Sequence, residues 1–69
     1  MNMKPVISTN VKYVGYSPET KDLHVQFNSG ATYAYHGVSE ENYAALMAAP
    51  SIGVHLNKHI KLHHKFTQK

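Results

Sequence analysis

The sequence predicts an α+β domain in which a three-stranded antiparallel β-meander precedes two short helices. The first half carries short runs of β-branched, aromatic and alternating apolar residues, which are typical of strands. The second half carries apolar residues at helical spacing, and each run follows a serine. A chain of 69 residues is too short for two domains. We therefore expect residues 1–10 as a lead-in segment, residues 11–66 as a single domain and residues 67–69 as a tail.

The three strands are predicted from residue type and alternation. Residues 11–16 are rich in β-branched and aromatic side chains, and a polar turn containing Pro18 follows them. Residues 23–28 alternate between apolar and polar side chains, which is the pattern of a half-buried strand. Residues 31–36 come after a tight turn signal and form the third strand.

The turn between the second and third strands decides which face carries the tyrosines. A two-residue turn would place Gln26 opposite Tyr33 and display Tyr33 and Tyr35 on the polar face as a stacking platform. A three-residue loop over residues 28–30, with its glycine in the left-handed conformation, would place Val25 opposite Tyr33. We favour the second register because it gathers five large side chains on one face.

Both helices have recognisable start signals. Ser39 can cap the first helix, which Pro50 ends. Ser51 can cap a second helix, which we expect to run to about His63, and Phe66 is expected to pack back onto the core. Apolar side chains recur at every fourth position of the second helix, at Ile52, Leu56 and Ile60.

The charges are distributed unevenly along the chain. All four acidic residues lie in residues 1–41, which also hold three lysines, for a balance of −1. Residues 42–69 hold four lysines and no acid, for a balance of +4, together with four of the six histidines. This asymmetry suggests an anionic partner; the alternative is a solvated surface that keeps the chain soluble. The absence of arginine argues against base-specific recognition of duplex DNA.

The residue types argue against a metal site and against enzymatic activity. There is no cysteine, so disulfides and thiolate ligands are excluded. His55, His59 and His63 are spaced as helical metal ligands, but the neighbouring Lys58 and Lys61 would repel a cation. We expect no cofactor, and the histidines would instead add positive charge below neutral pH. No carboxylate accompanies a serine–histidine pair and no glycine-rich phosphate loop is present, so we expect no catalysis.

No run of apolar residues is long enough for a signal peptide or a membrane span. We therefore expect a cytoplasmic protein with no membrane contact, or a protein of the host cytoplasm if it is encoded by a phage.

An ordered series of short motifs extends over roughly residues 8–66. The motifs are Val11-x-x-Val14-Gly15-Tyr16, Leu23-x-Val25-x-Phe27-x-x-Gly30, Tyr33-x-Tyr35-x-Gly37-Val38, Tyr43-x-x-Leu46 and Ser51-x-Gly53-x-x-Leu56-Asn57-x-x-Ile60. The series resembles the KTSC domain family. That family includes a C-terminal extension of some lysyl-tRNA synthetases and many stand-alone small bacterial and phage proteins. The resemblance implies nucleic-acid binding.

The predicted function is a small non-catalytic binding module for nucleic acid, most simply single-stranded RNA or tRNA, through the basic second helix. A serine, a glycine and an asparagine around a helix start can present polar groups to an anion, and tyrosine rings can stack unpaired bases. The candidate ligand-binding residues are Ser51, Gly53, His55, Asn57, Lys58, Lys61, Tyr33 and Tyr35.

Two other functions are compatible with the same residues. One is a phage or bacterial accessory protein that binds a nucleotide-like or phosphorylated small ligand as a homo-oligomer, because so small a domain often needs a partner subunit. The other is a protein-interaction domain that binds no anion.

Overall fold

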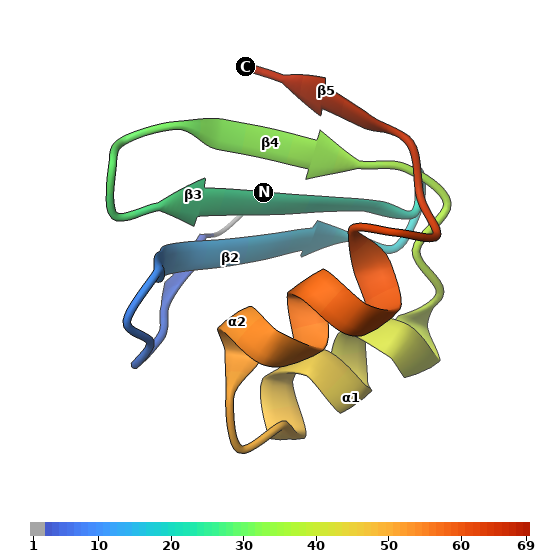
Figure 1. The fold of residues 1–69 in the computed structure, drawn as a ribbon. Helices are drawn as coiled ribbons and strands as arrows, with labels where there is room; N and C mark the ends of the chain where they lie inside the picture. The colour runs from blue at the N-terminus through green and yellow to red at the C-terminus, as the bar shows by residue number, and fades with distance from the viewer. Residues whose placement is uncertain (1–2) are drawn as a thin grey trace.

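The structure is a computed structural model that describes residues 3–69. Within these residues, one antiparallel sheet of five strands, in the order β1-β2-β3-β4-β5, packs against a layer of helices on one of its faces (Figure 1). The strands are β1 (Lys4–Pro5), β2 (Val11–Ser17), β3 (Asp22–Phe27), β4 (Thr32–Tyr35) and β5 (Phe66–Gln68). The helical elements are α1 (Glu40–Ala48), α2 (Ile52–His55) and the π-helical turn η1 (Leu56–Ile60).

The predicted α+β class is confirmed, and the three predicted strands correspond to β2, β3 and β4. The predicted number of strands was wrong, because the sheet of the described residues has five strands and not three. Strand β1 lies within the predicted lead-in segment and pairs with β2, and β5 spans the predicted domain end and tail and pairs with β4. Strands of two and three residues are too short to show an alternating pattern. They form because the edges of the meander offer unpaired backbone groups.

The predicted register of the central hairpin is confirmed. Val25 lies opposite Tyr33, and Leu23 lies opposite Tyr35. Gly30 has a φ of 97°, so the loop contains the residue of positive φ that a three-residue hairpin connection needs. Both tyrosines therefore share the face of the sheet that packs against the helices.

Strand β5 is tied to the sheet by side chains as well as by backbone pairing. The Nε2 atom of His36 lies 2.8 Å from the Thr67 hydroxyl, and its Nδ1 atom lies 2.9 Å from a carboxylate oxygen of Asp22. This hydrogen bond from His36 lowers the pKa of the Asp22 carboxyl below its ordinary value. The three residues link β3, the end of β4 and β5 across three neighbouring strands.

Both predicted helix caps are confirmed. The Ser39 hydroxyl accepts a hydrogen bond from the Asn42 N–H at 3.1 Å, and the Ser51 hydroxyl accepts one from the Val54 N–H at 3.4 Å. Within residues 3–69, no helix has the length and apolar character needed to cross a membrane.

The second helix widens into a π-helical turn, in which the Lys61 N–H donates to the Leu56 carbonyl at 2.7 Å. Ile52, Leu56 and Ile60 are 8%, 1% and 0% exposed, so all three face the core. In a regular α-helix, residues four apart drift by about 40° per step. The wider π turn reverses that drift and keeps the three apolar residues aligned.

The helix ends earlier than predicted. Its last residue is Ile60, where the sequence pattern had placed the end near His63. The N–H groups of His63 and His64 both donate to the Ile60 carbonyl and close the chain into a turn toward β5. Short helices depend on tertiary packing for their stability, so packing also decides where they end. The last residue of this helix that is buried against the core is Ile60.

The core lies between the sheet and the helices. It is formed by ten buried side chains, contributed by all three central strands, the β4–α1 connection and all helical elements: Val11, Val14, Leu23, Val25, Tyr35, Val38, Leu46, Ile52, Leu56 and Ile60.

Candidate ligand-binding groove

A groove of about 440 Å³ lies between the second helical segment and the ends of the central strands. Its volume is within the range of small-molecule sites, roughly 300–1,000 Å³. One wall is the side of α2 and η1, and the other is made by the two chain segments before β2 and between β3 and β4. Polar side chains line much of it, namely Thr9, Asn10, Asn28, Ser29, Asn57 and Lys61.

The two loops that form the outer wall are joined to each other. The Asn28 side-chain amide donates to the Thr9 carbonyl at 2.8 Å, and the Asn28 backbone N–H donates to the Asn10 carbonyl at 2.8 Å. Ser8 holds the first loop, because its hydroxyl lies 3.3 Å from the backbone nitrogen of Asn10. The outer wall is therefore one connected unit built from segments far apart in the sequence.

Gly53 is the point at which the helix approaches the outer wall. A side chain beginning at this position would meet the Asn10 side-chain nitrogen at 3.6 Å and the Ser8 hydroxyl at 3.8 Å. These are ordinary contact distances, so a methyl group would just fill the space between the helix and the first loop. The glycine therefore lies at a close approach of the helix to the outer wall of the groove.

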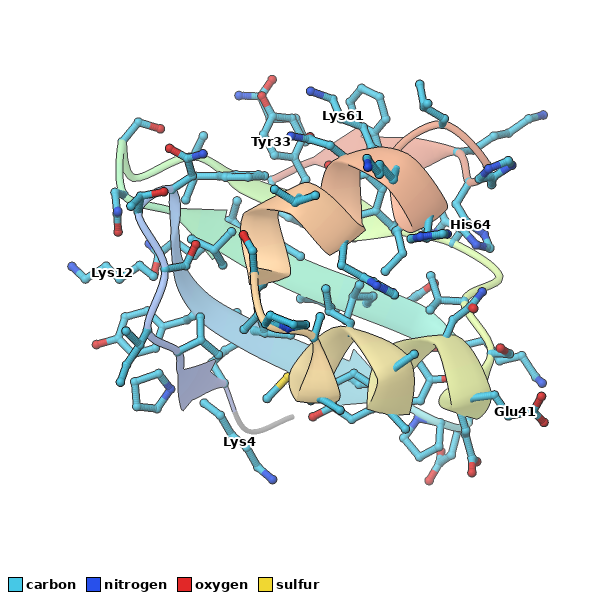
Figure 2. The ribbon with its side chains drawn as sticks, turned by 60° about the horizontal axis from the view of Figure 1, so that its bottom comes forward. Lys4, Lys12, Tyr33, Glu41, Lys61 and His64 are labelled. Carbon is cyan, nitrogen blue, oxygen red and sulfur yellow. The ribbon has the colours of Figure 1, made fainter. Side chains whose placement is uncertain are left out.

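Aromatic rings form the floor of the groove. Phe27 and Tyr33 both line it, with ring centroids 5.5 Å apart and ring planes 74° apart. Tyr33 is half-buried, and it lines the groove together with Lys61, whose labelled side chain appears near that of Tyr33 in Figure 2. The groove thus combines a ring, several amide or hydroxyl groups and one ammonium group.

Four of the eight predicted ligand-binding residues line this groove, and the other four do not. The residues within it are Gly53, Asn57, Lys61 and Tyr33. Tyr35 is 2% exposed and belongs to the core, where burial raises the pKa of its hydroxyl, so it has no surface to offer a ligand. The remaining three lie along a separate, smaller hollow on another side of the helix: Ser51, His55 and Lys58.

The histidines do not join the groove. His55 and His59 face each other with ring centroids 4.6 Å apart, in the second hollow. Burial, and then the neighbouring His59, lowers the pKa of His55 below its ordinary value, and its buried Nε2 atom has no hydrogen-bond partner among the described residues. Among residues 3–69, no three or more histidine or acidic side chains come together as a metal-binding group. His55 is therefore less readily protonated near neutral pH than an exposed histidine.

The prediction missed the outer wall of the groove. Thr9 and Asn10 fell in the predicted lead-in segment, and Asn28 and Ser29 were interpreted only as turn residues. Nothing in the local sequence connects the two segments, because their contact depends on the pairing of β2 with β3. Phe27, assigned to the apolar face, also reaches the groove floor.

Comparison with known proteins assigns the chain to one family. A sequence model of the KTSC domain matches residues 7–64. An uncharacterised protein of Stutzerimonas stutzeri is 42% identical over 57 residues, which cover 83% of this chain and 80% of the relative. A lysine–tRNA ligase of Nostoc punctiforme is 40% identical over 58 residues, which are 84% of this chain but 10% of the ligase.

A solved structure has the same fold. The crystal structure of a KTSC domain protein from Yersinia pestis superposes with a TM-score of 0.95 at 31% identity, covering 99% of this chain and 96% of that one. With the matching sequence model, relatives and fold, this chain belongs to the KTSC domain family.

Proposed function

We propose that this protein is a non-catalytic module that binds single-stranded RNA, or an unpaired segment of a tRNA, in the groove beside α2 and η1. The observation that carries the proposal is the convergence of Tyr33, Asn57 and Lys61 on one concave surface. A tyrosine ring can stack on an unpaired base, an amide can hydrogen-bond to a base edge, and an ammonium group can contact a phosphate.

The charge distribution supports an anionic ligand on this side of the molecule. Residues 42–69 carry four lysines and no acidic residue, and they include the helical wall of the groove. Lysine acts as a point charge on phosphate and does not make the planar bidentate contacts of arginine. Binding should therefore depend on the phosphate backbone and on stacking, with strong salt dependence.

The relative among the lysine–tRNA ligases supports RNA as the class of ligand. A segment similar to this chain makes up 10% of that protein, which is named as a ligase of lysine and tRNA. A domain of this kind attached to a tRNA-handling enzyme would increase its hold on the nucleic acid by raising the effective concentration of a second contact. An RNA ligand also implies a cytoplasmic location.

The proposal can be tested with a charge substitution and a matched control. Lys61→Gln removes the ammonium group of the groove, whereas Lys12→Gln removes an exposed lysine of β2 that lies beside Tyr13 and well away from Lys61 (Figure 2). Binding of a fluorescently labelled single-stranded RNA would be measured by anisotropy at increasing salt concentration.

We expect the wild type to bind at low salt and to weaken as salt is added. Lys61→Gln should lower the affinity and reduce the magnitude of the slope of log affinity against log salt by about 0.7, the change for one lost phosphate contact on a single strand. Lys12→Gln should behave as the wild type. A flat titration of the wild type at low salt, or equal effects of the two substitutions, would refute the proposal.

A further inference from the structure

Phe66 continues the aromatic floor of the groove onto the edge of the sheet. It lies directly opposite Tyr35 in the β4–β5 pair, so its side chain is on the same face of the sheet as the tyrosines. Its ring centroid is 5.3 Å from that of Tyr33, the ring that lines the groove. The sequence of rings from the groove to the edge is therefore Phe27, Tyr33 and Phe66.

The prediction that Phe66 packs back onto the core is confirmed only in part. Its ring contacts Tyr33 and Tyr35, yet 52% of the residue remains exposed. The chain thus places a partly exposed phenylalanine ring beside Tyr33, which lines a groove that also contains Lys61. An exposed aromatic ring next to a positive charge is the arrangement that proteins use to stack single-stranded nucleic acid.

The angle between the rings restricts what the pair can bind. The planes of Tyr33 and Phe66 are 79° apart, so a base stacked on one ring would be nearly perpendicular to a base stacked on the other. Successive bases in a duplex or in a stacked single strand are roughly parallel and could not occupy both rings. A strand whose bases are splayed apart could occupy both.

We propose that Phe66 is a second base-stacking platform, so that the site holds at least two consecutive unpaired nucleotides with their bases splayed. The ligand is then a polynucleotide strand and not a mononucleotide. This inference rests on the proposed function, and it adds to it the length and the conformation of the bound RNA.

The experiment compares ligands of different length on the wild type, on two variants of Phe66 and on one control variant at another position. Calorimetric titrations at low salt would measure binding of three ligands to the wild type and to three variants. The ligands are adenosine monophosphate, the adenylate dinucleotide and the adenylate tetranucleotide. Phe66→Leu keeps an apolar side chain of similar size without a flat ring, and Phe66→Trp restores an aromatic face. Leu62→Ala is the matched control, since Leu62 is another exposed apolar residue, 77% exposed, in the turn before β5. Far-UV circular dichroism and the thermal midpoint would verify that each variant is folded.

We expect the wild type to bind the dinucleotide and tetranucleotide much more tightly than the monophosphate. Phe66→Leu should weaken binding of the tetranucleotide by roughly 5- to 150-fold, the range for loss of one stacked base, and leave binding of the monophosphate unchanged. Phe66→Trp should recover the affinity for the longer ligands, and Leu62→Ala should match the wild type.

The possible failures are distinguishable. If the monophosphate binds in a Lys61-dependent manner but the dinucleotide binds no more tightly, the second platform is refuted while the groove still holds a nucleotide. The same conclusion follows if Phe66→Leu and Leu62→Ala weaken the tetranucleotide equally. If none of the three ligands binds the wild type, both the proposed function and this inference fail.

Discussion

Ile60 is the residue on which the helical wall of the groove depends. It is 0% exposed, it is the last residue of η1, and its carbonyl accepts hydrogen bonds from the N–H groups of His63 and His64. Lys61 follows it directly and extends into the groove. Shortening the Ile60 side chain should therefore loosen the end of the helix and the position of the lysine together.

The expected magnitude follows from its complete burial. Ile→Val at a buried position typically costs about 0.5–1.5 kcal/mol, and Ile→Ala about 2–5 kcal/mol. A chain of 69 residues has a total stability of roughly 3–10 kcal/mol. Ile60→Ala would thus remove a large part of the stability, so Ile60→Val is the quantitative variant. A cost of 1 kcal/mol corresponds to a lowering of the thermal midpoint by about 4–8 °C in a domain of this size.

Urea denaturation followed by circular dichroism measures the effect, with the slope of the unfolding free energy expected to stay unchanged. Leu62→Ala serves as the control, because Leu62 is 77% exposed and its loss should change the stability by less than about 0.5 kcal/mol. If Ile60→Val shifts the midpoint no more than Leu62→Ala does, Ile60 is not the anchor of this segment and the account of the π turn is wrong.

Three further predictions concern β5, His55 and the hairpin. Thr67→Val removes the hydroxyl bonded to His36 and should accelerate amide hydrogen exchange of His36 and Lys69, whose N–H groups bond across the β4–β5 pair; unchanged exchange would contradict a clamping role. Burial lowers the pKa of His55 below its ordinary 6.5, so the unfolded chain binds more protons just below that pH and stability should fall as the pH is lowered through 6.5. His55→Gln should make this fall shallower, and identical pH profiles would refute the assignment. Gly30→Ala should lower stability by roughly 1–2 kcal/mol through backbone strain alone, because φ is 97° and, within residues 3–69, no atom lies within 4 Å of the added methyl group; a thermal midpoint equal to that of the wild type would contradict it.

Much of the fold could be predicted from local patterns. The loop of residues 28–30 placed Val25 opposite Tyr33, as observed, since a glycine of positive φ selects a three-residue connection. Both serine caps were correct for an equally local reason, namely that their hydroxyls bond to N–H groups three residues later. The edge strands β1 and β5 could not be predicted in this way, because they exist only through their pairing with strands elsewhere in the chain.

The candidate site could be predicted only in part. The sequence grouped residues 51–61 as one basic surface, whereas the structure divides them among three sides of the helix. The period of four that buries Ile52, Leu56 and Ile60 also aligns Gly53, Asn57 and Lys61 on the groove. Ser51, His55 and His59 have the same spacing and lie along the second hollow. The four-residue spacing could therefore have predicted that these residues lie on different sides of the helix. The π turn, which keeps each set of residues aligned from residue 51 to residue 61, was not predicted.

The amino-acid sequence was sufficient for the secondary-structure signals, the register of the central hairpin and the concentration of positive charge in the second half. These features depend on neighbouring residues and on composition. The groove required the folded chain, because its outer wall joins Thr9 and Asn10 to Asn28 through hydrogen bonds across segments that the sheet brings together. The exposure of Phe66 and the burial of Tyr35 were likewise decided by tertiary structure, since Phe66 stands on an edge strand and Tyr35 beneath the helices.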